Sequence, residues 1–162
     1  MNSDRIEKII LLRAPRERVW RALSDSKEFG AWFGVKLDAP FSPGALVRGK
    51  IVGTVADPAI AVAQKQFEGV PFEITVERVE PQTLISFRWH PHAVDPSVDY
   101  SNEPTTLIEF TLKDAPNGTI LTVTESGFDR IPLARRAKAF TANEQGWGTV
   151  LQLVEKYLAQ AA

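Results

Sequence analysis

Asn143 and Glu125 are the two polar side chains whose places in the sequence best suit contact with a bound molecule. Asn143 lies between Phe140 and Trp147 at helical spacing, so its amide should face the interior of the protein. A buried amide without partners costs roughly 1–3 kcal/mol, so it must bond to protein, to water or to a ligand. A bond to a sheet side chain or an ordered water is one interpretation, and a polar contact in a ligand cavity is the other.

Glu125 has the same strand parity as the apolar residues Leu121 and Val123, which predicts that its carboxylate also faces inward. An inward carboxylate is desolvated, an environment that suits a general acid or a ligand anchor. The alternative is that the end of the strand reaches solvent or an arginine. If both side chains face inward, Asn143 and Glu125 could together hydrogen-bond a hydroxyl or carbonyl group of a ligand.

The two histidines of the chain, His90 and His92, flank Pro91 at the predicted end of a strand. With Asp95 or Asp99 they would supply the ligand types that zinc uses. The proline and the surrounding loop favour solvated histidines instead, so we expect no metal. The chain has no cysteine, which excludes thiol nucleophiles, thiolate zinc sites and iron–sulfur ligation.

Other catalytic and cofactor signatures were sought along the chain. Nothing resembles a Gly-X-Ser-X-Gly elbow, a phosphate loop or a dinucleotide fingerprint, and no nucleophile stands beside a recognisable base. We therefore predict no catalytic residue and no cofactor. Of the three functions considered, acid–base catalysis by Glu125 or a histidine, as in a cyclase, dehydratase or hydrolase, ranks last.

Aromatic side chains should form most of the core, and some of them should line any cavity built from the same faces. Those expected at the cavity, beside Asn143 and Glu125, are Trp32, Phe33, Phe87, Trp89, Tyr100, Phe110, Phe140 and Trp147. Trp147 stands between Gly146 and Gly148, each of which costs about 1 kcal/mol inside a helix. This pair indicates either the close approach of another element or a softened helix.

Two polar segments could take part in binding. Residues 100–104 read YSNEP and are expected near the cavity mouth, where they could act as a lid. A basic cluster at the start of the last helix, Arg130, Arg135, Arg136 and Lys138, could meet an acidic partner or an anionic ligand. A solvated helix face is the favoured interpretation, because positive charge is mildly unfavourable at a helix N-terminus.

Length and composition indicate one globular domain. The chain has 162 residues, of which 44% are hydrophobic and 24% charged. Its formal net charge of −1 argues against a nucleic-acid partner, since such proteins neutralise phosphates with clustered Lys and Arg. The longest apolar run, residues 59–63, is far shorter than the roughly 18 residues of a membrane span, and no secretory signal is present. We expect a cytoplasmic protein.

The elements that must position these residues can be predicted in order. Residues 5–13 suit a strand, Pro15 opens a helix, and a second short helix begins at Asp25 and ends at Gly34. Alternating apolar residues and turn signals predict further strands at 46–52, 70–79, 84–90, 105–113 and 119–126. The structure of residues 53–69 stays open between loop, short helix and strand.

Asn117-Gly118 is a strong hairpin signal, so the last two strands should pair antiparallel. After Pro132 the apolar residues recur every three or four positions as far as Leu158, which predicts one long terminal helix. An antiparallel sheet with helices on one side is the α+β arrangement that buries these faces.

Several separated motifs resemble the START-like SRPBCC superfamily, and within it the branch related to the C-terminal domain of the Hsp90 ATPase activator. They are PRERVWRAL at 15–23, WFG at 32–34, LISFRW at 84–89, the segment 118–128 and Gly146-Trp147. The resemblance runs in order from about Ile6 to Leu158, so residues 1–162 are taken as a single domain. It implies a helix-grip fold: a curved antiparallel sheet wrapped around the long C-terminal helix, with a cavity between them.

The resemblance implies less about activity, because members of the superfamily bind lipids, hormones or polyketides, cyclise aromatic polyketides or assist a chaperone. We expect non-enzymatic binding of a small, largely hydrophobic or aromatic ligand between the sheet and the terminal helix. The alternative is a protein-interaction module for a chaperone or a stress response. The oligomeric state stays open between monomer and homodimer.

Overall fold

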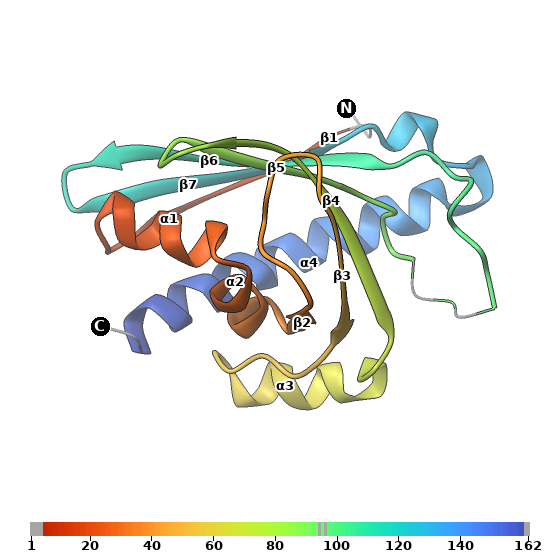
Figure 1. Ribbon diagram of the computed structural model, residues 1–162, viewed down its shortest axis with the longest axis horizontal. Coiled ribbons are helices and arrows are strands. Elements are labelled where there is room, and N and C mark those ends of the chain that lie inside the picture. Colours follow the sequence, from red (N-terminus) through yellow and green to blue (C-terminus); the bar gives the residue numbers. More distant parts are fainter. Residues whose placement is uncertain (1–4, 94, 96, 161–162) are drawn as a thin grey trace.

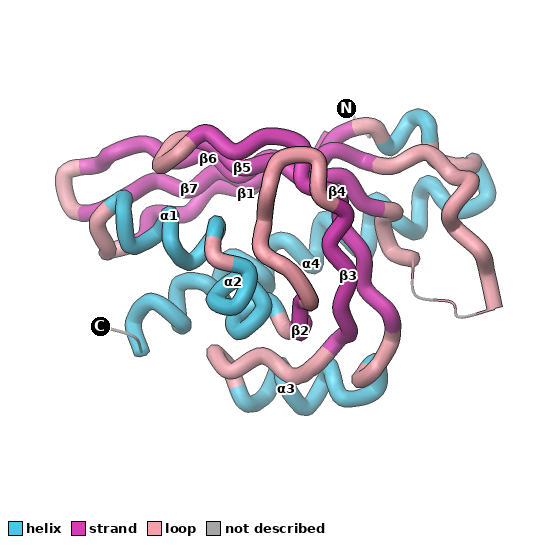
Figure 2. Tube along the Cα trace, viewed as in Figure 1, coloured by secondary structure: helices cyan, strands magenta, loops and turns pink. Residues whose placement is uncertain are grey.

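A seven-stranded antiparallel sheet and one long helix organise the chain, in a computed structural model that describes residues 5–93, 95 and 97–160 (Figure 1). The order of the strands is β1-β7-β6-β5-β4-β3-β2, so the first and last strands of the chain lie side by side at one edge of the sheet. The predicted α+β class with a helix-grip arrangement is confirmed. Strands β3 and β4 bend away from β1, β6 and β7, which gives the sheet its curvature (Figure 2).

The bounds of the elements agree closely with the predicted ones. The strands are β1 (Arg5–Leu12), β2 (Val35–Leu37), β3 (Leu46–Ile51), β4 (Pro71–Glu80), β5 (Leu84–Trp89), β6 (Thr106–Ala115) and β7 (Gly118–Ser126). The helices are α1 (Arg16–Ser24), α2 (Ser26–Phe33), α3 (Pro58–Gln64) and α4 (Leu133–Gln160), with short 3-10 turns η1 (Lys65–Phe67) and η2 (Phe128–Arg130).

Local sequence explains where the helices begin and end. The Asp25 carboxylate accepts hydrogen bonds from the backbone N–H groups of Lys27 and Glu28 and so caps α2. The Glu28 carboxylate pairs with Arg18 of α1 at 2.8 Å. Gly34 ends α2 with a φ of 99°, a left-handed conformation that glycine adopts without strain.

Two elements escaped prediction. Strand β2 has only three residues, too few for an alternation pattern, and it pairs with β3 at the sheet edge. Helix α3 lies in the open segment 53–69, where Asp57 caps it and Pro58 occupies the first turn. Residues 59–63 form an unbroken apolar run, so no helical period distinguishes the segment from a strand, and none of its residues is buried.

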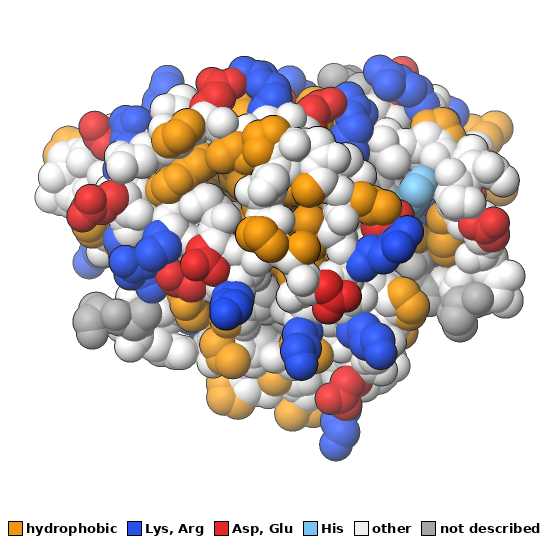
Figure 3. Space-filling view, viewed as in Figure 1, with side chains coloured by type: hydrophobic (Ala, Val, Ile, Leu, Met, Phe, Trp, Pro, Cys, Tyr) orange, Lys and Arg blue, Asp and Glu red, His pale blue; other side chains and the backbone are white. Residues whose placement is uncertain are grey.

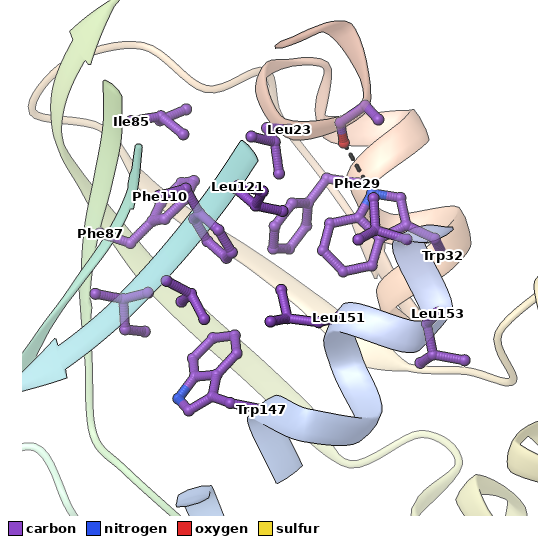
Figure 4. Packing of buried hydrophobic residues seen from close by; sticks show 14 of the residues in the cluster. Leu23, Phe29, Trp32, Ile85, Phe87, Phe110, Leu121, Trp147, Leu151 and Leu153 are labelled. Carbon is purple, nitrogen blue, oxygen red and sulfur yellow. Dashed lines mark hydrogen bonds between the residues drawn. The ribbon is translucent and has the colours of Figure 1, made fainter. Parts of the chain in front are cut away.

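The space between the sheet and the C-terminal half of α4 is filled by side chains. Figure 4 shows Phe29 and Trp32 of α2 pointing toward Phe87 and Phe110 of the sheet and Leu151 of α4. The Trp32 indole N–H donates to the Ala22 carbonyl oxygen at 2.8 Å, which satisfies its polar atom within the core. The cavity left among these aromatic rings measures about 10 Å³, room for one water at most.

No helix within the described part of the chain combines the length and the apolar character that crossing a membrane requires.

Candidate functional site

An open pocket of about 620 Å³ lies at the other end of the space between sheet and α4. It is bounded by the end of α2, by β4 and β5, by the loop that follows β5 and by Asn143 of α4. Its apolar lining includes Phe33, Phe67, Phe72, Trp89, Val98 and Tyr100. The volume is in the range of small-molecule sites, and the apolar lining is interrupted by polar side chains such as Glu73, Asp99 and Asn143.

Glu125 lies behind the inner wall of this pocket, with no exposed surface. Its Oε2 accepts hydrogen bonds from Thr106 Oγ1 at 2.5 Å and from the Trp89 indole at 2.7 Å. Its Oε1 accepts from the Trp147 indole at 2.8 Å. Asn143 Nδ2 donates to both oxygens, at 2.9 and 3.1 Å. The carboxylate therefore joins β5, β6, β7 and α4 at one point.

These four donors match the chemistry of a carboxylate, which accepts hydrogen bonds at both oxygens. No lysine or arginine of the described chain forms an ion pair with Glu125, so neutral N–H and O–H groups compensate its burial. With both oxygens occupied, the carboxylate cannot reach a molecule in the pocket. Glu125 acts instead on its donors, because it fixes the orientation of Trp89, Asn143 and Trp147.

Asn143 is the group through which Glu125 acts on the pocket. Because Nδ2 donates to both carboxylate oxygens, the amide cannot flip without placing Oδ1 against negative charge. No described residue donates to Oδ1. Ser86 Oγ is the only described side-chain atom that is both buried and without a partner, so Oδ1 is not sealed inside the protein. Asn143 lines the pocket, and Oδ1 is the acceptor that its amide retains for a further partner.

Arg135 of α4 fastens the loop that forms the outer wall. Its guanidinium bonds the Glu103 carboxylate at 2.7 Å and the carbonyl oxygens of Pro91 and His92 at 3.1 and 3.3 Å. It also lies 4.7 Å from the centre of the Tyr100 ring, a cation–π distance. The expectation of a solvated helix face is therefore wrong for Arg135, whose partners stand in a loop distant in the sequence.

The two histidines line the same wall but serve different contacts. His90 Nε2 donates to the Glu103 carbonyl oxygen at 3.0 Å, which leaves Nδ1 as the acceptor of the neutral ring. Burial lowers the pKa of His92 below its ordinary value, and the charges of Lys138 and Arg135 add to this effect. Within the described residues, no group of three or more histidine and carboxylate side chains is arranged to hold a metal ion.

Comparison with known proteins identifies the family. The profile described as "Activator of Hsp90 ATPase homolog 1-like protein" matches residues 13–159. The chain belongs to this family. It is thus a member of the START-like SRPBCC superfamily, as its motifs indicated. No curated protein matched the chain.

Solved structures share the fold of this family member. Protein MLL2253 from Mesorhizobium loti superposes with a TM-score of 0.71 at 23% identity, over 98% of both chains. Protein SSP2350 from Staphylococcus saprophyticus has a TM-score of 0.67 at 20% identity, over 98% of this chain and 93% of its own. DynU16, a protein of the dynemicin biosynthetic locus, has a TM-score of 0.68 at 26% identity. That match covers 98% of this chain but 48% of DynU16.

The residues predicted at the cavity fall into three groups in this family member. Phe33, Trp89, Tyr100 and Asn143 line the open pocket, and Glu125 and Trp147 lie directly behind Asn143 and Trp89. Trp32, Phe87 and Phe110 belong to the packed core, where each is at most 1% exposed. Phe140 packs on Phe128, with ring centres 5.2 Å apart, and lies outside the pocket lining.

Sequence reasoning missed several pocket residues. Phe72 alternates with Ile74 and Val76 along β4, a period that could have placed it on the inner face. Phe67 and Val98 lie in a 3-10 turn and a loop, where no periodicity exists to find them. The interpretation of Gly146 and Gly148 as sites of close approach is wrong, since a β-carbon at either position would meet no atom within 4 Å.

Proposed function

We propose that this family member binds a small, largely apolar molecule in the open pocket beside Asn143. The observation that supports the proposal most is the pocket itself: about 620 Å³, within the roughly 300–1,000 Å³ typical of ligand sites. Binding takes place at the open end of the space between sheet and α4, because the centre of that space has no room for a ligand.

The arrangement of Glu125 favours binding over acid–base catalysis by this residue. A general acid or base must come within hydrogen-bond reach of the proton that it transfers. Both Glu125 oxygens are turned to protein donors, and the side chain has no exposed surface. Burying Glu125 costs free energy. That cost is better explained by the rigid orientation that Glu125 gives to the Trp89 and Asn143 side chains in the pocket wall.

The setting of one solved relative is consistent with a small-molecule ligand. DynU16 comes from the dynemicin biosynthetic locus. This chain spans about half the length of DynU16, so the likeness concerns one domain of that protein. It supports the class of ligand and not its identity.

A pair of variants of identical chemistry tests the proposal. Val70 lines the pocket, whereas Val62 of α3 is 73% exposed and lies outside the pocket lining. The wild-type protein is screened by thermal unfolding against aromatic, polyketide, isoprenoid and fatty-acid compounds. A compound at about 100 times its Kd should stabilise the fold by roughly 2.7 kcal/mol, or about 5–11 °C.

Val70→Trp should fill the pocket and abolish the shift, and Val62→Trp should retain it. Equal shifts in the two variants, with both folded by circular dichroism, would place the ligand elsewhere and refute the proposal. Failure of every compound to shift the wild-type melting temperature would also count against it.

A further inference from the structure

We propose that the pocket selects apolar molecules that carry a protonated amine over alcohols and carboxylic acids of the same size. This inference rests on the proposed function and concerns the chemistry of its ligand. Three independent features of the pocket carry it: the acceptor of Asn143, the charges of the lining and the aromatic walls.

The first feature is the fixed direction of the Asn143 amide. Its Nδ2 is held by the buried Glu125 carboxylate at 2.9 and 3.1 Å, which fixes Oδ1 as the acceptor end of the amide. An amide oxygen accepts hydrogen bonds and cannot donate them. A ligand group that lies against it must therefore be an N–H or O–H donor, and a carboxylate or ether oxygen would be left without a partner.

The second feature is the sign of the charge around the pocket. Glu73, Asp95 and Asp99 are among the described residues of the lining, and no lysine or arginine is. Asp95 and Asp99 accept bonds from Ser97 and Ser101, which lower the pKa of each carboxyl group, so both are ionised at neutral pH.

The nearby cations do not reverse this sign. Arg48 pairs with Glu73 at 3.1 Å and offsets one carboxylate, but it lies outside the lining. Arg135 and Lys138, whose charges both act on His92, also lie outside the lining, and Glu103 neutralises Arg135 at 2.7 Å. His92, whose pKa is lowered mainly by burial, adds no positive charge at neutral pH. The remaining field favours a cation and opposes an anion.

The third feature is the aromatic wall. Trp89, Tyr100, Phe33 and Phe72 all border the pocket. The faces of such rings attract ammonium groups, tryptophan most strongly, while they also bury an apolar body. The pocket thus offers rings for the apolar part of the ligand, an acceptor for its N–H groups and carboxylates at the rim.

Four naphthalene compounds of nearly equal size separate these effects. They are 1-naphthylmethylamine, which is a cationic donor, 1-naphthylmethanol, a neutral donor, its methyl ether, which has no donor, and 1-naphthoate, an anion. Binding is measured through the tryptophan fluorescence of the wild-type protein and by calorimetry. Affinity should fall in that order, with the amine at least about tenfold tighter than the acid.

Charge is then tested in the protein. Asp99→Asn keeps the acceptor for Ser101 but removes one negative charge at the pocket, and should weaken the amine roughly two- to fivefold while leaving the alcohol unchanged. Asp114→Asn removes the same charge near the hairpin that joins β6 and β7, outside the pocket lining. It should leave the affinity for both compounds unchanged.

The outcomes distinguish the two proposals. If 1-naphthoate binds as tightly as the amine, or if Asp99→Asn and Asp114→Asn act alike, the preference for amines is refuted while the pocket remains a binding site. If none of the four compounds binds but a compound of the wider screen does, the preference is refuted alone; if nothing in either set binds, the preference falls together with the proposed function.

Discussion

The two ends of the space between the sheet and α4 are built from the same kinds of residue but have opposite structures. At one end the ring centres of Phe29, Phe87 and Phe110 lie 5.8–6.2 Å apart. The cavity that remains there measures about 10 Å³. At the other, Phe72 and Trp89 border an open pocket of about 620 Å³. The two ends differ in what covers them: Phe29 and Trp32 of α2 fill the first end, whereas the loop after β5 borders the second and leaves it open.

Aromatic composition alone therefore does not separate a core from a binding site. On one face of the molecule, hydrophobic side chains gather near the centre and Lys, Arg, Asp and Glu surround them (Figure 3). Glu125 stands between the two ends, since its donors include Trp147 of the packed end and Asn143 of the pocket. Changes at this boundary and on either side of it test the comparison.

Replacement of Glu125 should have the largest effect on stability. Glu125→Leu leaves four donors without an acceptor, two of them on the buried residues Thr106 and Trp147, and each buried donor costs roughly 1–3 kcal/mol, so we expect a loss of at least about 2 kcal/mol. Glu125→Gln keeps the shape and one acceptor oxygen and should lose less. Urea unfolding of both variants measures the difference. Equal stability of Glu125→Leu and the wild type would contradict the role assigned to the carboxylate.

Truncation of one phenylalanine at each end compares the regions directly. Phe87→Ala removes a ring that is 1% exposed and should cost about 3–5 kcal/mol. Phe72→Ala removes a half-buried ring of the pocket wall and should cost less than about 2 kcal/mol, because part of its surface already faces water.

Ligand affinity should respond in the opposite order, weakened by Phe72→Ala and retained in any folded Phe87→Ala protein. Chemical denaturation and fluorescence titration of both variants provide the two measurements. A larger loss of stability from Phe72→Ala would mean that the pocket wall is part of the core.

Arg135→Gln should loosen the outer wall with a modest effect on stability, about 1–2 kcal/mol. It also removes one of the charges that lower the pKa of His92, so that pKa should rise toward its ordinary value. NMR titration of the histidine rings measures the change. An unchanged His92 titration would contradict the placement of Arg135 beside the loop.

The same shift makes a prediction for stability in the wild type. Because the folded protein binds the His92 proton less readily than the unfolded chain, stability should decrease as the pH falls from about 6.5 toward the lower folded pKa. A His92→Gln variant should lack this component in thermal melts recorded across that range. Persistence of the whole pH dependence in the variant would assign it to other groups.

The smallest effect is expected at the glycines beside Trp147. Space surrounds both positions, so Gly146→Ala and Gly148→Ala should each stabilise the protein by about 0.5–1 kcal/mol through helix propensity. Thermal unfolding measures this gain, and fluorescence titration should show unchanged ligand affinity. Loss of affinity without loss of stability would instead show that a softened α4 takes part in binding.

The sequence was sufficient for the fold because its information is local. Alternation placed Ile108, Phe110 and Leu112 on one face of β6, and Asn117-Gly118 marked the hairpin that joins β6 and β7. Parity also turned Glu125 inward, where it has no exposed surface. Helix α3 escaped because residues 59–63 form an unbroken apolar run, which no helical period distinguishes from a strand.

The site could be predicted only in part because it depends on contacts between distant residues. Helical spacing pointed Asn143 inward, but the four partners of Glu125 come from separate elements, and no spacing reveals them together. Phe33 and Phe87 were equal candidates, and the packing of α2 decided that Phe33 borders the pocket while Phe87 does not. Arg135 was misjudged because its acceptors lie in the loop after β5.

The most direct test of the account is NMR mapping of where a ligand lies, with 1-naphthylmethylamine added to isotope-labelled protein. The account predicts that the largest changes in chemical shift occur at the Asn143 side-chain amide, Tyr100 and Phe72, with small changes at Phe87 and Phe110. Changes centred on Phe87 and Phe110 would show that the ligand enters between sheet and helix. That result, or saturation of no site at all, would contradict the central claim that the open end is the binding end.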